Sequence, residues 1–323
     1  MKYYIGCDLG GTNIKVGIVD VTSGNVVASL GAPTLARNGH EDVIKRMAET
    51  MQTLVSQQSV KWNEIGGIGV SAPGRLDLEK GETIFLPNLH GQWHHVPLKA
   101  RLEEYLGKPV YLLNDVRAIT YGEWAFGAGK GVETMVCFAI GTGVGGGIVY
   151  KNQLVLTQGG AAGELGHISV DLNGPKCNCG NYGCVEVYAS GPAITAMGVK
   201  AVIQGATTSI GERCGHDLNK INPKLLATAA LEGDIVAQEI WDTVGLHLGV
   251  GICNTALAIG PERVVISGGV AAAGDLLLNP IRRTLMERMF VMPSEKIEIV
   301  LGKLGDDAGI IGTAVWASQG GKQ

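Results

Sequence analysis

Residues 5–20 read IGCDLGGTNIKVGIVD, and residues 137–152 read CFAIGTGVGGGIVYKN. Each stretch starts with an apolar run, passes through a glycine-rich turn and enters a second apolar run, which is typical of a β-hairpin. Residues 65–74 (IGGIGVSAPG) and 264–274 (VVISGGVAAAG) form a second similar pair, each a buried strand that ends at small residues. Recurring motifs of this kind indicate a duplicated structural unit. We therefore predict an α/β protein built from two related domains around a central cleft.

The length of 323 residues exceeds what a single hydrophobic core usually supports, so size also favours two domains. We predict an N-terminal α/β domain over residues 1–117 and a C-terminal α/β domain over residues 118–305. The last segment, about residues 306–323, is predicted to form a helix that returns to the first domain. Helical spacing over residues 41–56 is followed by the apolar strand 65–70.

Composition excludes several classes of protein. A net charge of −4 and a pI near 6.0, without a run of Lys or Arg, argue against nucleic-acid binding. The most apolar helical stretch, residues 245–259, is shorter than a membrane crossing requires, so we interpret it as a buried helix. The residues before the first predicted strand lack the basic and apolar regions of a signal peptide. The chain has seven cysteines, an odd number that does not suit a framework of paired disulfides. We expect a cytoplasmic protein with reduced thiols and no membrane partner.

The two glycine-rich turns are candidate phosphate sites. A turn without side chains can direct several backbone N–H groups at phosphate oxygens. Polar side chains accompany both turns, and Asp8 could hold a hydrated Mg²⁺. The alternative is that each turn is an ordinary tight hairpin. The candidate nucleotide-binding residues here are Asp8, Gly10, Gly11, Thr12, Lys15, Gly141, Thr142 and Gly143.

A dehydrogenase is a rival interpretation of the second turn, because residues 141–146 formally match GxGxxG. The dinucleotide-binding motif requires a helix after the glycines, whereas the β-branched segment Ile148-Val149-Tyr150 predicts a strand. The sequence also lacks GxxxxGK[ST], which excludes the P-loop class. We therefore reject the dinucleotide-binding (Rossmann) class and the P-loop class.

Asn114 and Asp115 follow a short apolar strand, where α/β proteins place ligands. Phosphoryl transfer to an alcohol needs a carboxylate that accepts the hydroxyl proton, and Asp115 could serve. The alternative is that Asp115 only caps a helix that begins at Val116. Both roles are compatible.

Residues 166–186, GHISVDLNGPKCNCGNYGCVE, concentrate metal-ligand chemistry. His167 is followed by Cys177, Cys179 and Cys184, a set that suits tetrahedral Zn²⁺ and leaves no position open for a catalytic water. A redox pair is less favoured because the close pair is CxC rather than CxxC. Buried structural thiols are less favoured because the neighbours are polar. We predict a structural zinc site.

These motifs together resemble the ROK family of sugar kinases. The resemblance rests on DLGGTNIK (8–15), ND (114–115), IGTGVGGG (140–147), GELGH (163–167) and CNCGNYGC with Glu186. It extends through SGGV (267–270) and so covers nearly the whole chain. The family has the actin-like ATPase fold, which is ribonuclease H-like. The resemblance implies ATP- and Mg²⁺-dependent phosphorylation of a hexose 6-hydroxyl, and is strongest with bacterial ATP-dependent glucokinases.

The resemblance also implies a role for each matching residue. Asp115 corresponds to the catalytic base. His167 would bind both zinc and sugar, so that zinc shapes the sugar site without touching the phosphate. Gly268 and Gly269 correspond to nucleotide-binding positions. The residues that correspond to sugar ligands are Gly74, Asn88, Asn114, Asp115, Glu164, His167 and Glu186.

Several alternatives bear on substrate and regulation. Residues 93–98 (WHHVPL) and 117–120 (RAIT) depart from common glucokinase wording, which leaves fructose, mannose, allose or an N-acetylhexosamine as other substrates. A catalytically silent sugar sensor is a further alternative. Repressors of the family carry a helix-turn-helix domain before the first phosphate motif, whereas here that motif begins at Asp8, so we expect a kinase. We also expect a homo-oligomer, a dimer or tetramer.

Overall fold

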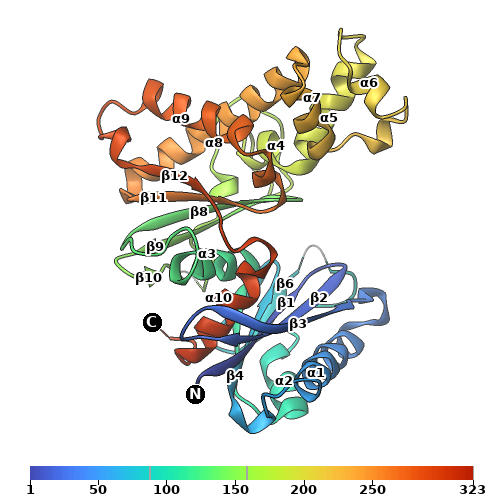
Figure 1. Cartoon of the computed structure of the whole chain (residues 1–323), viewed down its shortest axis with the longest axis vertical. Helices are drawn as coiled ribbons and strands as arrows, with labels where there is room; N and C mark the ends of the chain where they lie inside the picture. Colours follow the sequence, from blue (N-terminus) through green and yellow to red (C-terminus); the bar gives the residue numbers. More distant parts are fainter. Residues whose placement is uncertain (87–88, 158, 323) are drawn as a thin grey trace. The chain divides into compact units, whose positions relative to one another are not determined.

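The computed structural model describes residues 1–86, 89–157 and 159–322 (Figure 1). Its contacts define two compact units. Unit 1 comprises Met1–Val132, Gly147–Ala162 and Lys303–Gln323, and unit 2 comprises Glu133–Gly146 and Gly163–Gly302.

Unit 1 is built on a five-stranded sheet of order β3-β2-β1-β4-β7. The strand β1 is antiparallel to β2 and parallel to β4, which is in turn parallel to β7. Apolar side chains of β1 and β2 pack in one core with those of α1 and α2. The bounds are β1 Tyr3–Leu9, β2 Asn13–Asp20, β3 Asn25–Pro33, β4 Ile65–Ala72, β7 Val110–Asn114, α1 His40–Ser56 and α2 Leu98–Leu106.

Glycines let a C-terminal helix approach this sheet closely. A Cβ on Gly6 would lie 1.9 Å from the carbonyl oxygen of Ile310, and one on Gly69 would lie 1.8 Å from that of Thr313. Both partners belong to α10 (Ala308–Ser318), which also packs on α3 (Asp115–Ala125). At that contact a Cβ on Gly312 would lie 1.8 Å from the carbonyl oxygen of Ala118. Any side chain at these positions would force the helices apart.

Unit 2 contains a helical layer on strands β8, β11 and β12, which are mutually parallel. The long helix α8 packs along α9, where Gly245 and Gly249 face Pro280 and Thr284. The helices are α4 Glu186–Ala189, α5 Gly191–Ile203, α6 Ile210–Arg213, α7 Pro223–Leu231, α8 Ile235–Ile259 and α9 Asp275–Arg288.

The second five-stranded sheet has the order β10-β9-β8-β11-β12, which reproduces the order of the first sheet strand for strand. Each begins with a hairpin at a glycine-rich turn, then adds parallel strands. The predicted duplication is thus confirmed by topology. The strands are β8 Met135–Ile140, β9 Val144–Tyr150, β10 Gln153–Leu154, β11 Arg263–Ser267 and β12 Glu298–Leu301.

Short elements complete the chain. A small two-stranded sheet joins β5 (Arg75–Asp77) to β6 (Glu82–Phe85). The 3-10 helices are η1 Ala36–Asn38, η2 Trp62–Glu64, η3 Leu165–His167, η4 Leu218–Lys220, η5 Gly269–Ala273, η6 Ser294–Lys296 and η7 Gly305–Asp307.

Two observations differ from the sequence-based expectation. The apolar stretch predicted at 245–259 is the second half of α8, a 25-residue helix that by length and composition alone could cross a membrane. Half of its most apolar window is buried, as in the core helix of a globular fold. The other difference concerns the predicted second domain, residues 118–305: α3, which packs on α10, and residues 147–162 both group with unit 1.

Candidate functional site

Three neighbouring strand ends bring the predicted residues of unit 1 together. Asp8 of β1 pairs in register with Ser71 of β4, and Ala72 pairs with Asn114 of β7. Because these strands are parallel, their carboxyl ends meet at one edge of the sheet, where α/β proteins bind ligands. Asp8, Asn114 and the adjoining Asp115 therefore occupy one edge.

Asp8 is held by a hydroxyl group. Ser71 Oγ donates to Asp8 Oδ1 at 2.6 Å. Burial raises the pKa of Asp8, although the Ser71 hydroxyl and the charge of Lys15 both act to lower it. A carboxylate at a sheet edge, oriented by a hydroxyl donor, is suited to hold a hydrated divalent cation.

The first glycine turn closes tightly. Gly10 N donates to Asn13 O at 3.0 Å, and a Cβ on Gly10 would lie 2.8 Å from that same oxygen. Thr34 Oγ1 donates to Gly10 O at 2.7 Å. Gly11 and Thr12 remain exposed. The Lys15 ammonium donates to Asp306 O and pairs with Asp307 Oδ1, each at 2.8 Å, so the cation is joined to the start of the C-terminal segment.

Asn114 and Asp115 take their positions from the start of α3. Asn114 is the N-cap, and its Oδ1 accepts from the backbone N–H groups of Val116 and Arg117. Its Nδ2 donates to Gly74 O at 2.9 Å. The helix begins at Asp115, one residue earlier than the cap alternative assumed, and Asn114 supplies the cap. Asp115 Oδ1 accepts from Val116 N at 2.9 Å.

Arg117 is buried next to this pair, with 1% of its surface exposed. Its Nη2 donates to Ala162 O at 2.8 Å, and its Nη1 donates to Asn114 Oδ1 at 3.2 Å. The guanidinium therefore joins the backbone at Ala162 to the amide beside the predicted base. Because Arg117 is anchored on a backbone carbonyl, its guanidinium helps to hold the amide of Asn114 in place.

The second glycine turn lies in unit 2. Gly141 N donates to Gly143 O at 2.9 Å, and Val144 N donates to Glu186 Oε2 at 3.0 Å. Gly268, at the end of β11, has φ 84°, and a Cβ there would lie 2.4 Å from Ile140 O. A Cβ on Gly141 or Gly269 would meet open space instead. The predicted nucleotide residues of unit 2 thus lie at the ends of two adjacent parallel strands.

The predicted metal ligands converge. One ligand atom from each of His167, Cys177, Cys179 and Cys184 can be chosen so that all lie within 4.8 Å of one another. His167 Nδ1 lies 3.6 Å from Cys177 Sγ, and Cys179 Sγ lies 3.8 Å from Cys184 Sγ. None of the three cysteines forms a disulfide. Burial and the neighbouring thiols raise the pKa of Cys184 to about 12. Three thiols and an imidazole at this spacing fit tetrahedral zinc.

Backbone turns shape this Cys/His knuckle, which we define as residues 167–184. Cys177 N donates to Asn181 O at 2.7 Å, and Gly180 N donates to Cys177 O at 3.0 Å. Gly180 has φ 96° and Gly183 has φ 60°, conformations that glycine adopts without a steric penalty. The CxCG and GC segments can therefore fold back on each other.

Glu164 and Glu186 flank the knuckle, and His167 belongs to it. His167 N donates to Glu164 O at 3.1 Å across η3, so the two side chains originate from one turn. Glu186 begins α4, and its Oε1 lies 3.8 Å from Cys177 Sγ. Asn88 lies outside the described residues.

A comparison with known protein families agrees with these motifs. The profile of the ROK family matches residues 4–320. The chain belongs to the ROK family.

ROK proteins of known structure share the fold. A ROK family glucokinase from Streptomyces griseus, solved in complex with glucose and AMPPNP, superimposes with a TM-score of 0.83 at 31% identity over 98% of this chain and 99% of that chain. The glucokinase of Thermotoga maritima is 38% identical over 312 residues, which are 96% of this chain and 95% of that protein. The actin-like ATPase fold expected for a ROK protein is thus confirmed.

ROK repressors are also similar to this chain. The xylose repressor of Caldicellulosiruptor bescii is 30% identical over 308 residues, which cover 95% of this chain and 76% of that repressor. Similarity within the ROK family therefore extends to regulators as well as enzymes.

Two residues of this ROK protein were not predicted from the sequence. Ser71 donates to Asp8, and Arg117 donates to Asn114, but neither residue belongs to a motif that indicates such a contact. The small residues at the end of β4 could have pointed to Ser71. Arg117 lies in the segment 117–120, whose sequence differs from that of common glucokinases, and this difference could have pointed to it.

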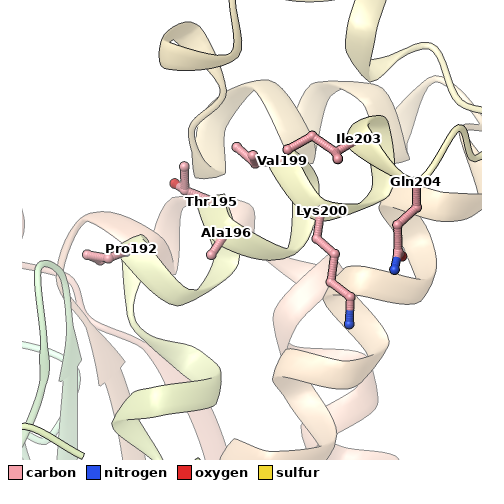
Figure 2. Close-up of a pocket in the computed structure, with 7 residues that line it drawn as sticks. All are labelled: Pro192, Thr195, Ala196, Val199, Lys200, Ile203 and Gln204. Carbon is pink, nitrogen blue, oxygen red and sulfur yellow. The ribbon is translucent and has the colours of Figure 1, made fainter.

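A separate hollow lies along one face of α5. Figure 2 shows Pro192, Ala196 and Lys200 spaced along that helix, about one turn apart. This face is mainly aliphatic and contains none of the predicted site residues. The chemistry therefore concentrates at the strand ends and the knuckle.

Proposed function

We propose that this ROK protein is an ATP- and Mg²⁺-dependent hexose kinase that phosphorylates glucose at its 6-hydroxyl group. The observation that carries the proposal is Asp115, placed one residue beyond β7 at the sheet edge that also presents Asp8. Glucokinases that match nearly the full chain support the choice of glucose.

Asp115 would be the general base. Its Oδ1 is oriented by Val116 N at 2.9 Å, so the carboxylate is held at the start of α3. In phosphoryl transfer such a group accepts the hydroxyl proton as the oxygen attacks the γ-phosphate. Asp8 would hold the hydrated Mg²⁺, which neutralises charge on the phosphates. The backbone N–H groups of both glycine turns, with Thr12, Lys15, Thr142, Gly268 and Gly269, would bind ATP.

Sugar hydroxyls would be bound by Gly74, Asn88, Asn114, Glu164, His167 and Glu186. The contacts of Asn114 restrict what it can do. Its Oδ1 already accepts from Val116 N, Arg117 N and Arg117 Nη1, and its Nδ2 already donates to Gly74 O. Asn114 therefore has one N–H left and would act on the sugar as a donor only.

His167 would bind zinc through Nδ1, the nitrogen that faces Cys177 at 3.6 Å. Zinc bound by four protein ligands plays a structural part. The opposite nitrogen, Nε2, would then carry a proton in a fixed direction and donate to a sugar hydroxyl. We place the enzyme in the cytoplasm and expect a homo-oligomer.

A sugar-responsive regulator without kinase activity is the second candidate, since a xylose repressor matches 95% of this chain. Initial rates with ATP and Mg²⁺ across glucose, fructose, mannose, allose, N-acetylhexosamines and xylose distinguish the two. A kinase should give one hexose with a clearly highest kcat/KM, because buried polar groups reject sugars that leave them unpaired. Sugar binding without turnover of any sugar would refute the kinase proposal and support the regulator.

A further inference from the structure

The short helix α4 connects the Cys/His knuckle to the second glycine turn. Cys184 is the last thiol of the knuckle, and Glu186 begins α4 two residues later. Val185 N donates to Ile168 O at 3.0 Å, and Val187 N donates to Cys184 O at 3.2 Å. The position of Glu186 is therefore set by backbone that belongs to the knuckle.

Both ends of α4 hold the glycine turn. Glu186 Oε2 accepts from Val144 N at 3.0 Å, and Gly191 N, just past the helix, donates to Gly141 O at 2.8 Å. A Cβ added to Gly143 would lie 2.5 Å from Glu186 Oε2. The carboxylate is thus packed against the turn, and the missing side chain at Gly143 makes room for it.

Side-chain contacts brace α4 from behind. The ring of Tyr188 stacks on that of His247 in α8, with centroids 3.8 Å apart and an interplanar angle of 10°. Tyr188 Oη donates to Asp171 Oδ2 of the knuckle at 2.9 Å. Val185 packs against α8 at Gly251, where a Cβ would lie 2.5 Å from Val185 Cγ2. A helix of four residues held in this way follows the knuckle and α8 rather than moving alone.

We propose that Glu186 is a positioning residue for the glycine turn of residues 141–144, and that the Cys/His knuckle controls nucleotide binding through it. This inference rests on the proposed function, in which that turn binds ATP phosphates. A carboxylate that accepts a backbone N–H fixes the peptide plane in which that N–H lies, and with it the direction of neighbouring N–H groups. The knuckle thus serves the phosphate side as well as the sugar side.

The knuckle also contacts Glu186 through a side chain. Cys177 Sγ lies 3.8 Å from Glu186 Oε1, whereas Val144 N donates to the other carboxylate oxygen, Oε2. The carboxylate thus lies between a predicted zinc ligand and the glycine turn, so loss of the metal should loosen the knuckle and, with it, the position of Glu186.

The test compares Glu186→Ala, Glu186→Gln and a matched control, Glu212→Gln, which removes an exposed carboxylate of unit 2. In Glu186→Ala, KM for ATP should rise about tenfold, because a charge-assisted hydrogen bond is lost. Amide hydrogen exchange in a peptide spanning residues 141–150 should accelerate by about the same factor. Glu186→Gln keeps an uncharged acceptor, so its KM for ATP and its exchange rate should lie between those of the parent protein and those of Glu186→Ala. The control should match the parent protein.

Gly143→Ala provides an independent arm. Its new Cβ should displace the Glu186 carboxylate and raise KM for ATP. In the double variant Gly143→Ala/Glu186→Ala, the change at Gly143 should add little to the effect of Glu186→Ala, because the carboxylate oxygen that the Cβ would meet is absent. Additive effects of the two changes would overturn the proposal.

Chelation of zinc should accelerate exchange in residues 141–150 more than in the β11 peptide, residues 263–267. Equal exchange of the 141–150 peptide with and without metal would remove the knuckle from the proposal. If Glu186 only binds sugar, Glu186→Ala would raise KM for glucose and leave KM for ATP and exchange unchanged, which would refute the positioning role. An inactive parent protein would instead refute the proposed kinase, and the exchange experiments would still test the Glu186 contact.

Discussion

Arg117 Nη1 lies 3.2 Å from Asn114 Oδ1, so a buried guanidinium fixes the amide next to the proposed base. The same guanidinium donates to Ala161 O and Ala162 O through Nη2. One side chain thereby supports both a proposed sugar ligand and the backbone at Ala161 and Ala162.

Replacing Arg117 by Met should raise KM for glucose by about tenfold, because the amide of Asn114 loses a charge-assisted partner. The free energy of unfolding should fall by about 3 kcal/mol, because buried carbonyl groups are left unpaired. Steady-state kinetics and urea unfolding measure both quantities. Arg117→Lys keeps the charge but not the fork of donors and should recover stability better than KM. A parent-like KM in Arg117→Met would contradict the positioning of Asn114.

Asp115→Asn should reduce kcat by about 10²- to 10⁴-fold, the usual contribution of a positioned general base. Glucose binding should be retained, because the Asn oxygen can still accept from Val116 N. Single-turnover kinetics and calorimetric glucose titration separate the two quantities. Near-normal turnover would show that another group removes the proton.

The knuckle should contain about one zinc per chain, as measured by elemental analysis of the purified protein. Cys184→Ser should lose the metal and lower the thermal midpoint, because folding and metal binding are linked. Cys214→Ser is the matched control: its sulfur donates to Gly211 O at 3.1 Å outside the knuckle, and a hydroxyl can replace that bond. A zinc-free parent protein that is as stable and active as the zinc-containing protein would contradict a structural zinc site.

Local patterns made the hairpins, the glycine turns and the knuckle predictable. In each case the residues that act together are close in the sequence, as in the thiols between Cys177 and Cys184. Alternation and turn chemistry act over the same short range. These features could be derived without knowing the fold.

Contacts between distant segments could not be derived. Ser71 reaches Asp8 because β1 and β4 happen to pair in that register, across 63 residues of sequence. The contact of Glu186 with Val144 N involves a backbone group, which leaves no trace in residue type. The apolar stretch 245–259 likewise did not show that α8 begins at Ile235, where the N-cap Asp234 also accepts from Ser209 N in the loop before α6.

Glu123 shows how far such a contact reaches, and it gives a prediction about stability. This fully buried carboxylate accepts from Ala128 N, Lys303 N and Leu304 N, at 2.8 to 3.0 Å. It therefore ties α3 to the segment that leads into α10. Glu123→Gln replaces one acceptor oxygen by an amide that cannot accept, so the free energy of unfolding should fall by about 3 kcal/mol.

Urea unfolding of Glu123→Gln checks that value, with Glu79→Gln at an exposed position as the control. Amide exchange should accelerate at residues 303–304 in particular. A change below about 0.5 kcal/mol, typical of surface substitutions, would mean that water replaces the carboxylate.

Asp234 predicts how stability depends on pH. Its carboxylate caps α8 through Ala237 N and also accepts from Ser209 N and from the hydroxyl groups of Thr208 and Ser209. These hydrogen bonds outweigh burial and lower the pKa of Asp234 to about 2. Because the folded pKa lies below the unfolded value of 3.8, the ionised group stabilises the fold above about pH 4, and that stabilisation is lost as pH falls toward 2.

The contribution of Asp234 at neutral pH should be about 2 kcal/mol, the free energy that corresponds to this pKa difference. Asp234→Asn keeps a capping oxygen but removes the charge, so it should be less stable than the parent at pH 7. The difference between the two proteins should narrow between pH 4 and pH 2, because the parent then also loses its charge. Unfolding free energies of both proteins, measured from pH 7 to pH 2, test this prediction. A difference between them that stays constant down to pH 2 would mean that Asp234→Asn loses stability through packing and not through the missing charge.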